Sequence, residues 1–420
     1  MELSIIIPTL NEENNISELI KHVKNVVSEL KITFEIIIID GGSIDKTVEN
    51  AKEAGADVIN QKIPGYGGAL IEGFKASKGK YIITMDADYS HNPYFISQMW
   101  HFRNKSDVII ASRYVKGGSA ESMPKFRRIL SIILNKVFTF GLSLPLKDMS
   151  SGFRMYNRRV FDDIEIIGRD FDALEEILIK AYINGWQIME VPFHYQMRKS
   201  GSSNAKLLKF ACSYTKTFYK MWQLRNSILS ADYDERAFDS RIFIQRYWQR
   251  KRYEIIMNYI KIDAWVLDIG CGSSKIFMNL KNAVGLDIDL KKLRYLRKKS
   301  NLLIKGDINF LPFKKEEFEC VICSEVIEHV PYSAEIFQEI SRVLKQNGTL
   351  IIGTPDYGRL IWRAIEFVYN LLLPRAYAQV HITQFNRKQL IEELEKAGFQ
   401  ILDYKYICSS ELIIKAKKKS

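Results

Sequence analysis

The chain has 420 residues, more than a single hydrophobic core usually serves, so we expect two domains. Hydrophobic residues make up 47% and charged residues 26% of it, as is typical of globular proteins, and the sequence lacks the uncharged run of about 18 residues that a transmembrane helix needs. The formal net charge of +12 favours anionic partners, but it does not choose among sugar nucleotides, lipid phosphates, a membrane surface and nucleic acid.

The first residues enter a strand-like run directly, without the basic and then apolar segment of a signal peptide. Five cysteines fit a reducing compartment. We therefore expect a cytoplasmic protein, with peripheral attachment to the inner face of the cell membrane as an option. Cys320 and Cys323 fall in one expected strand, where residues three apart face opposite sides of the sheet, so we interpret them as buried apolar residues and predict no zinc site.

In the first half, apolar strand-like runs alternate with helical patterns. Strands are expected at 3–7, 34–39, 57–61 and 81–85, with helices at about 13–30 and after Asp45. This alternation predicts an α/β domain built on a largely parallel sheet.

Polar motifs follow three of these strands. Pro8-Thr9-Leu10-Asn11-Glu12 follows the first, Asp40-Gly41-Gly42 the second, and Asp86-Ala87-Asp88 the run that ends at Met85. Ligands of parallel α/β sheets bind beyond the carboxyl ends of the strands, so the three motifs should converge on one crevice. Two carboxylates offer hard oxygens to a divalent cation, and we expect a turn after Met85 to aim both of them inward.

With Ser112-Arg113-Tyr114, Asp148-Met149-Ser150-Ser151-Gly152-Phe153-Arg154 and Glu190-Val191-Pro192-Phe193, these motifs resemble glycosyltransferase family 2, specifically its dolichyl-phosphate mannosyltransferase-like branch, over about residues 3–205. The resemblance implies a GT-A fold, a nucleotide-diphosphate sugar as donor, Mg²⁺ or Mn²⁺ as cofactor, and inversion at the anomeric carbon. Gly41 stands where many relatives carry a second carboxylate, which leaves the nucleotide base open.

The resemblance also assigns residues to roles. The expected donor site comprises Pro8, Leu10, Glu12, Asp40, Asp86, Ala87, Asp88 and Arg198, with Asp86 and Asp88 on the metal. The expected acceptor is a polyprenyl phosphate held by Arg113, Arg127 and Ser131, and such an anion needs no strong general base. The alternative is a glycan or glycolipid hydroxyl, which needs a base, and Asp148 and Glu176 are the candidates.

Two segments of the first half bear on membrane contact. Residues 129–146 and 205–228 are amphipathic, and each is expected either to pack on its own domain or to bind a membrane interface.

The polar segment 231–240 is expected to be irregular, and we place the domain boundary near residue 230. The predicted domains are a GT-A domain at 1–229, a linker with a covering helix at 230–255, and a second α/β domain at 256–420. The basic aromatic stretch 245–252 gives only weak support for nucleic-acid binding, so no nucleic-acid partner is expected. A helix that covers the second nucleotide site, with Tyr247 and Arg250 over the ligand, is the preferred interpretation.

A second series of strand-like runs begins at Ala264. Further strands are expected at 284–286, 302–305, 318–323 and 349–353, followed by a terminal hairpin of 400–406 and 411–416. Asp268-Ile269-Gly270-Cys271-Gly272 closes the first of these strands, and Asp287 ends the next about twenty residues on, where a carboxylate can reach ribose hydroxyls. Asp307 follows the third strand and Ser324-Glu325-Val326-Ile327-Glu328-His329 the fourth.

These motifs resemble class I S-adenosylmethionine-dependent methyltransferases, with a Rossmann-like fold, over about residues 245–420. The resemblance implies S-adenosylmethionine bound by the turn 268–272, including Asp268, Gly270 and Gly272, with Asp287 at the ribose and Asp307 at the adenine. His329 or His381 could accept a proton from the methyl acceptor. The expectation for the whole chain is a bifunctional enzyme of cell-surface glycan or glycolipid synthesis, with a second domain that only binds S-adenosylmethionine or docks a partner as the alternative.

Overall fold

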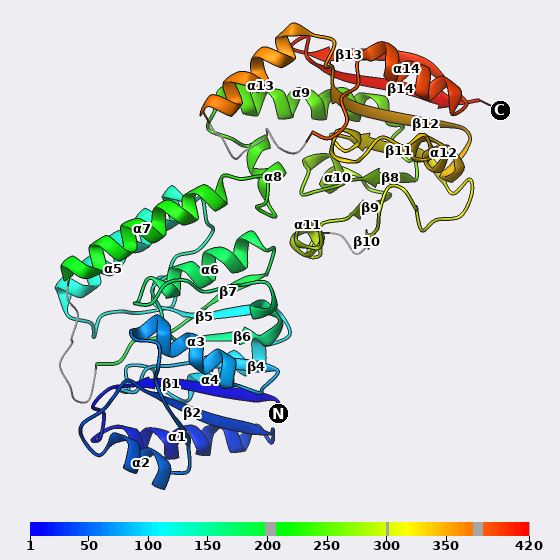
Figure 1. Cartoon of the computed structure of the whole chain (residues 1–420). Helices are drawn as coiled ribbons and strands as arrows, with labels where there is room; N and C mark the ends of the chain where they lie inside the picture. The colour runs from blue at the N-terminus through cyan, green and yellow to red at the C-terminus, as the bar shows by residue number, and fades with distance from the viewer. Residues whose placement is uncertain (198–206, 300–301, 373–380, 420) are drawn as a thin grey trace. The chain divides into compact units, whose positions relative to one another are not determined.

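The computed structural model describes residues 1–197, 207–299, 302–372 and 381–419. The chain forms two compact units, Met1–Arg225 and Asn226–Ser420, whose elements are labelled in Figure 1. The sequence placed the boundary near residue 230, and the structural division falls at Arg225.

The first unit contains a sheet with the strand order β3-β2-β1-β4-β6-β5-β7 in its described residues. Strand β6 runs antiparallel to both β4 and β5, whereas the other neighbouring strands pair in parallel. The strands are β1 Leu3–Thr9, β2 Phe34–Asp40, β3 Asp57–Asn60, β4 Tyr81–Thr84, β5 Val108–Ser112, β6 Arg154–Asn157 and β7 Ile188–Pro192.

Helices cover both faces of this sheet, and alternate residues of β1 belong to different cores. Ile5 and Ile7 pack with α1 and α4, whereas Ile6 packs with α3, α5, α6 and α7. Helix α1 begins at Ile16, three residues after the expected start. The helices are α1 Ile16–Glu29, α2 Thr47–Glu53, α3 Tyr66–Ala76, α4 Phe95–Phe102, α5 Lys125–Gly141, η1 Arg158–Asp162, α6 Ala173–Ile183 and α7 Leu207–Arg225.

The sheet of the second unit has the order β10-β9-β8-β11-β12-β14-β13 in its described residues. It is parallel from β10 to β12 and ends in the antiparallel hairpin of β13 and β14. The strands are β8 Val266–Ile269, β9 Ala283–Asp287, β10 Leu303–Lys305, β11 Phe318–Ser324, β12 Leu344–Pro355, β13 Phe399–Ile407 and β14 Glu411–Lys418. The expected α/β fold class, the Rossmann-like second sheet and the terminal hairpin are confirmed.

The helices of the second unit are α8 Tyr233–Phe238, α9 Phe243–Tyr259, α10 Lys275–Asn279, α11 Leu290–Leu296, η2 Ile327–His329, α12 Ala334–Val343, α13 Leu360–Leu372 and α14 Arg387–Lys396. The prediction of an irregular segment at 231–240 is wrong, because α8 forms there and buries Tyr233 and Ala237. The interpretation of the cysteines is confirmed: Cys320 and Cys323 are both buried and belong to the cores on opposite faces of the sheet.

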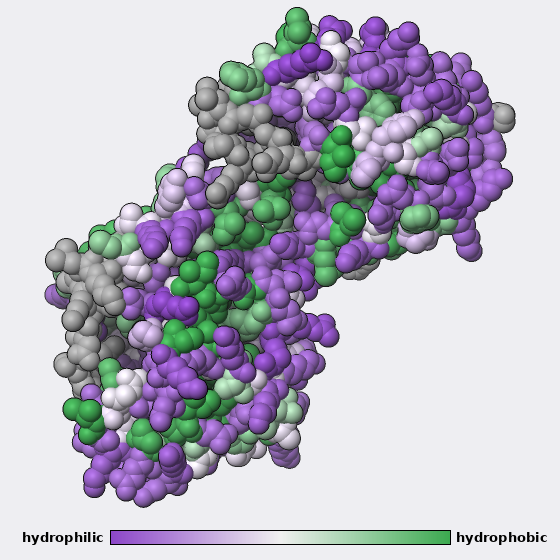
Figure 2. Space-filling model, in the orientation of Figure 1, coloured by the Kyte–Doolittle hydropathy of each residue, from purple (hydrophilic) through white to green (hydrophobic). Residues whose placement is uncertain are grey.

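On the face drawn in Figure 2, hydrophilic side chains cover most of each unit and hydrophobic ones form smaller separate groups. Along helix α5, exposed apolar residues recur at spacings of three and four. They are Phe126, Ile129, Leu130, Ile133, Val137 and Phe140. Such spacing defines one exposed apolar face, called here the α5 stripe. Among the helices of the described ranges, none is long and apolar enough to cross a membrane.

Candidate active sites

The carboxylate pair of the first unit lies just beyond the carboxyl end of β4. Tyr89 has a φ of +63°, a left-handed conformation that turns the chain directly after the pair. Asp88 is buried and accepts a hydrogen bond from the backbone N–H of Ser90 at 3.0 Å, whereas the side chain of Asp86 remains 33% exposed. Ala87 between them is buried.

Two side chains orient Asp86. The Tyr66 hydroxyl donates to its Oδ1 at 3.2 Å, and His91 accepts from its backbone N–H at Nδ1, at 2.9 Å. A neutral ring that accepts at Nδ1 carries its proton on Nε2, which here lies 3.7 Å from Oδ2 of Asp86. Phe171 stacks on the Tyr66 ring with centroids 4.5 Å apart. The sequence analysis gave no role to Tyr66 or to His91, although His91 lies only five residues after Asp86.

Pro8, Leu10, Glu12 and Asp40 lie at or just beyond the carboxyl ends of β1 and β2. Pro8 pairs with Ile39 in the sheet, and Leu10 is exposed beyond the strand. Asp40 is buried and accepts hydrogen bonds from the backbone N–H groups of Gly42 and Ser43, each at 3.0 Å. Glu12 accepts from the Asn15 amide at 2.6 Å. The Asp40 carboxylate therefore stabilises the turn that directly follows β2.

Arg113 and Asp148 form a buried fork. Nε and Nη2 of Arg113 donate to the two carboxylate oxygens of Asp148 at 2.8 and 2.6 Å, and the side chains are only 9% and 0% exposed. Burial disfavours the cation, but the adjacent Asp148 carboxylate outweighs this and raises the pKa of Arg113 above its ordinary value. Asp148 is thus fully engaged in holding Arg113.

A chain of hydroxyl groups connects this fork to α5. Arg113 also donates to Ser150 Oγ at 2.8 Å, which lies 2.9 Å from Ser131 Oγ. Arg127 lies one helical turn before Ser131, is half-buried, and has no ion pair within the described part of the chain. The structure therefore connects Arg113 and Ser131, and places Arg127 on the same helix.

Glu176 and its neighbour Glu175 are buried at the start of α6. Glu176 accepts from the backbone N–H of Gly168 at 2.6 Å and pairs with Lys180. Both carboxylate oxygens of Glu175 lack hydrogen-bond partners among the described residues, and burial raises the pKa of Glu175 to about 8. Sequence reasoning missed Glu175, although an acidic residue at a buried helix position was the available signal. Arg198 lies outside the described residues.

In the second unit, the glycine turn after β8 needs glycine. Gly270 and Gly272 have φ values of +67° and +51°, and a Cβ at Gly270 would overlap the side chain of Val326. The Gly272 N–H donates to Oδ2 of Asp287 at 2.8 Å, so the acid that ends β9 holds the turn. Oδ2 of Asp268 is buried and has no hydrogen-bond partner in the described part of the chain, and burial, followed by Asp287 and Asp234, raises the pKa of Asp268 to about 8.

Helix α8 also contacts the glycine turn, which the sequence did not predict. Oδ2 of Asp234 accepts from the backbone N–H of Ser273 at 3.0 Å and lies 3.2 Å from Nζ of Lys292. The neighbouring Glu235 pairs with Lys275 and Lys299. The acids of α8 therefore fix this helix beside the turn.

Helix α9 lines a pocket, but not with the expected face. Trp248 and Arg252 line it together with Glu325 and Trp362. Residues three or four apart share a face of a helix, so positions 245, 248, 249 and 252 turn to the pocket together. Tyr247 is exposed instead, and Arg250 pairs with Asp239 in an exposed ion pair at 3.3 Å, so neither lines this pocket, and their placement over the ligand stays a prediction.

Arg252 ties the pocket wall to the terminal hairpin. It makes hydrogen bonds of 2.6 and 2.7 Å to the buried Glu411, to which the Trp248 indole also donates, and its Nη2 lies 3.1 Å from Glu325. Glu325 has a φ of +59°, an uncommon conformation for a residue with a side chain.

The loop after β11 brings Glu328 and His329 next to His381, which also lines the pocket. Burial raises the pKa of Glu328 to about 8, and burial together with His329 lowers the pKa of His381 to about 4. Asp307 is exposed and accepts from the backbone N–H of Asn309 at 2.9 Å. The structure therefore brings together His329 and His381, the two residues that the sequence offered as proton acceptors.

Comparison with protein families gives one match in each of the two units. Residues 4–165 match the model of glycosyl transferase family 2, and residues 267–352 match a methyltransferase domain. The chain thus joins a glycosyltransferase family 2 domain to a methyltransferase domain, as the motifs predicted.

Individual proteins are also similar to parts of this chain. The dolichol-phosphate mannosyltransferase of Pyrococcus furiosus is 34% identical over 54% of this chain and 66% of its own length. The dolichyl-phosphate hexose transferase of Haloferax volcanii is 29% identical over 50% of this chain and 88% of its own. The chain therefore spans less than two thirds of the first of these relatives. A solved structure of a SAM-dependent methyltransferase from Thermotoga maritima aligns at a TM-score of 0.38 and 20% identity, over 44% of this chain and 94% of that one.

Proposed function

We propose that the first unit transfers a sugar from a nucleoside-diphosphate sugar to the phosphate of a polyprenyl lipid. One observation carries this proposal: the polar chain from Arg113 through Ser150 reaches Ser131 on α5, the helix that bears the α5 stripe. A polyprenyl phosphate combines an anion with a long apolar chain. The Ser131 hydroxyl and the Arg127 guanidinium of this helix can donate to phosphate oxygens, and an exposed apolar helix face suits acyl or prenyl chains.

The geometry favours a phosphate over a hydroxyl acceptor. A hydroxyl needs a general base, but Asp148 is engaged by Arg113 and Glu176 by Lys180. A phosphate is already ionised. The relatives' names, which specify dolichol or dolichyl phosphate with mannose or hexose, support the same acceptor class and a hexose donor.

The carboxylate pair fits a divalent cation on the donor side. Its ligands would be hard oxygens, and Tyr66 and His91 fix Asp86 while leaving it partly exposed. Bound Mg²⁺ or Mn²⁺ would stabilise the departing diphosphate as a Lewis acid. Asp86 and Asp88 would hold it, Asp148 would position Arg113, and attack by the phosphate oxygen from the opposite side would invert the anomeric carbon.

The second unit is proposed to bind S-adenosylmethionine and to transfer its methyl group to an acceptor in the pocket beside α9. A glycine turn of this kind lets a ligand approach the backbone, and Oδ2 of Asp268 is a buried acceptor without a partner among the residues that the structure describes. Methyl transfer depends chiefly on positioning of the two reactants. Tight binding without a methylated product would instead favour a module that only binds S-adenosylmethionine.

The setting proposed for both activities is the cytoplasmic face of a membrane, in cell-surface glycan or glycolipid synthesis. The net charge of +12 and the α5 stripe support peripheral contact with an anionic membrane surface.

The acceptor proposal is tested by replacing Arg127 and, as a matched control, Lys136, an exposed cation of the same helix. Native protein incubated with radiolabelled nucleotide sugars, polyprenyl phosphate and Mn²⁺ should form a lipid product. Arg127→Ala should raise the KM for the lipid by about tenfold or more, because a hydrogen bond to a charged group is lost, whereas Lys136→Ala should change it little. Absence of a metal-dependent lipid product from every donor would reject the lipid acceptor.

A further inference from the structure

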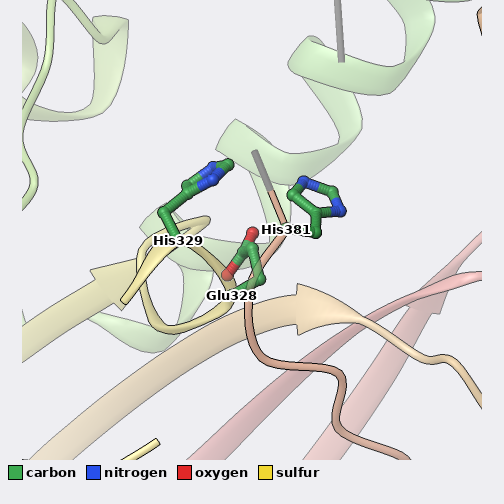
Figure 3. Close-up of side chains that lie close together, drawn as sticks. All are labelled: Glu328, His329 and His381. Carbon is green, nitrogen blue, oxygen red and sulfur yellow. The ribbon is translucent and has the colours of Figure 1, made fainter. Parts of the chain in front are cut away.

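We propose that Glu328, His329 and His381 bind a divalent transition-metal cation beside the methyl-donor site of the second unit. One ligand atom from each residue lies within 4.8 Å of the other two. Figure 3 shows the Glu328 carboxylate between the two imidazole rings, whose centroids are 4.9 Å apart. Metal–ligand bonds of about 2.0–2.2 Å need only a small inward movement of these side chains.

The Glu328 carboxylate supplies independent evidence for a ligand. The residue is fully buried, and Oε1 has no hydrogen-bond partner among the described residues. A buried polar oxygen without a partner costs free energy, so its persistence calls for a specific explanation. A cation held between Glu328 and the histidines would satisfy Oε1.

The surroundings orient the ligands as the outer contacts of metal sites do. Thr354 Oγ1 donates to Oε2 of Glu328 at 3.2 Å, and the Tyr357 hydroxyl lies 2.6 Å from Nδ1 of His381. Hydrogen bonds of this kind fix the rotamer and ring plane of a ligand. The backbone N–H groups of Ile382 and Thr383 donate to the Glu328 carbonyl at 2.7 and 3.1 Å, which joins the two segments that supply the site.

The cluster borders both parts of the proposed methylation site. Strand β11 is next to β8 in the sheet, and Val326, in the loop after β11, packs over Gly270 of the glycine turn. His381 lines the pocket formed by α9 and Trp362. The cation would therefore lie between the methyl donor and the space for an acceptor.

Two imidazoles and one carboxylate form a ligand set that is found in zinc enzymes and in mononuclear iron sites. This set leaves coordination positions of the cation open. This part of the inference rests on the proposed methyltransferase function: an acceptor oxygen bound to the cation would lose its proton to water more readily. That oxygen would form a bond to the methyl carbon as the carbon–sulfur bond breaks, and the electron pair of that bond would remain on sulfur. His329 would then be a ligand instead of a lone general base.

The test uses the full chain after removal of metals, titrated with Mn²⁺ and examined by pulsed electron paramagnetic resonance for coupling to ¹⁴N. An Asp86→Asn/Asp88→Asn background removes the carboxylates proposed for the first unit. In that background we expect histidine-coupled Mn²⁺ in the second unit. His329→Ala and His381→Ala should each remove part of the coupling, and the nearly isosteric Glu328→Gln should weaken Mn²⁺ binding by about tenfold or more.

His101→Ala is the matched control, because His101 is exposed and belongs to the first unit. Affinity for S-adenosylmethionine, measured in each variant, reports whether the second unit is folded. Absence of ¹⁴N coupling, or coupling that survives both histidine substitutions, would overturn the cation site. Histidine-coupled Mn²⁺ in protein that forms no methylated product would uphold the site and count against the proposed reaction.

Discussion

At the scale of single residues, the glycine turn shows both what local sequence predicts and what it does not. The pattern around Gly270 and Gly272 predicted a turn under a ligand, because glycine alone adopts a positive φ without a steric cost. The neighbours that crowd the turn, Val326 and Asp234, come from distant segments and have no local signal. The same holds for Arg113 and Asp148, which the motifs placed in separate roles and the structure joins in one fork.

Gly272→Ala should weaken S-adenosylmethionine binding by about tenfold or more, since backbone strain of this kind costs about 1–3 kcal/mol. The added Cβ would lie 2.5 Å from Oδ2 of Asp234, at a φ of +51°. Calorimetric titration measures the affinity. Gly398→Ala is the control, because Gly398 has a φ of +86° but open space around it and lies far along the chain from the turn. Equal losses in the two variants would mean that general destabilisation, and not the turn, is responsible.

At the scale of elements, strands were predicted more reliably than short helices. Strand β4 and the hairpin of β13 and β14 carry strong apolar signals, and they formed where expected. Helix α8 has only six residues, three of them charged, so no periodic pattern marked it. Its formation depends on tertiary ion pairs. For α9 the helix was predicted and its pocket-facing side was not, since a basic aromatic helix offers several plausible faces.

Glu235→Gln should lower the free energy of unfolding of the second unit by about 1–2 kcal/mol at pH 7. Burial alone would raise the pKa of Glu235, but hydrogen bonds from Lys275, Lys299 and Tyr295 outweigh it and lower the pKa to about 2. A lowered folded-state pKa stabilises the protein above the unfolded value of 4.5, and this contribution is lost as the pH falls toward about 2.

Urea unfolding of both proteins between pH 7 and pH 3 measures this difference, with hydrogen exchange assigning the transition to the second unit. The difference in free energy of unfolding between the native protein and Glu235→Gln should be largest at pH 7. It should decrease progressively below about pH 4.5. Asp239→Asn, which breaks an exposed pair with Arg250, should cost little. A gap for Glu235→Gln that widens as the pH falls would contradict the assignment.

At the scale of the whole molecule, each unit has hydrophobic cores formed by its own described residues. Each unit also has its own motifs at the ends of its strands. The sequence therefore predicted two α/β domains and the families to which they belong, because strand-end motifs are local. It did not predict the cluster of Glu328, His329 and His381 as one site, since His381 belongs to a segment without a recognisable pattern.

The central claim for the chain is that Asp86 and Asp88 hold a cation that binds the diphosphate of the sugar donor. The most direct measurement is calorimetric titration of UDP and GDP into the full chain, with and without Mn²⁺. Mn²⁺ should tighten the binding of at least one nucleotide by about tenfold or more. In Asp86→Asn/Asp88→Asn this gain should disappear while the affinity for S-adenosylmethionine stays unchanged. A gain that persists undiminished in the double variant would contradict the claim.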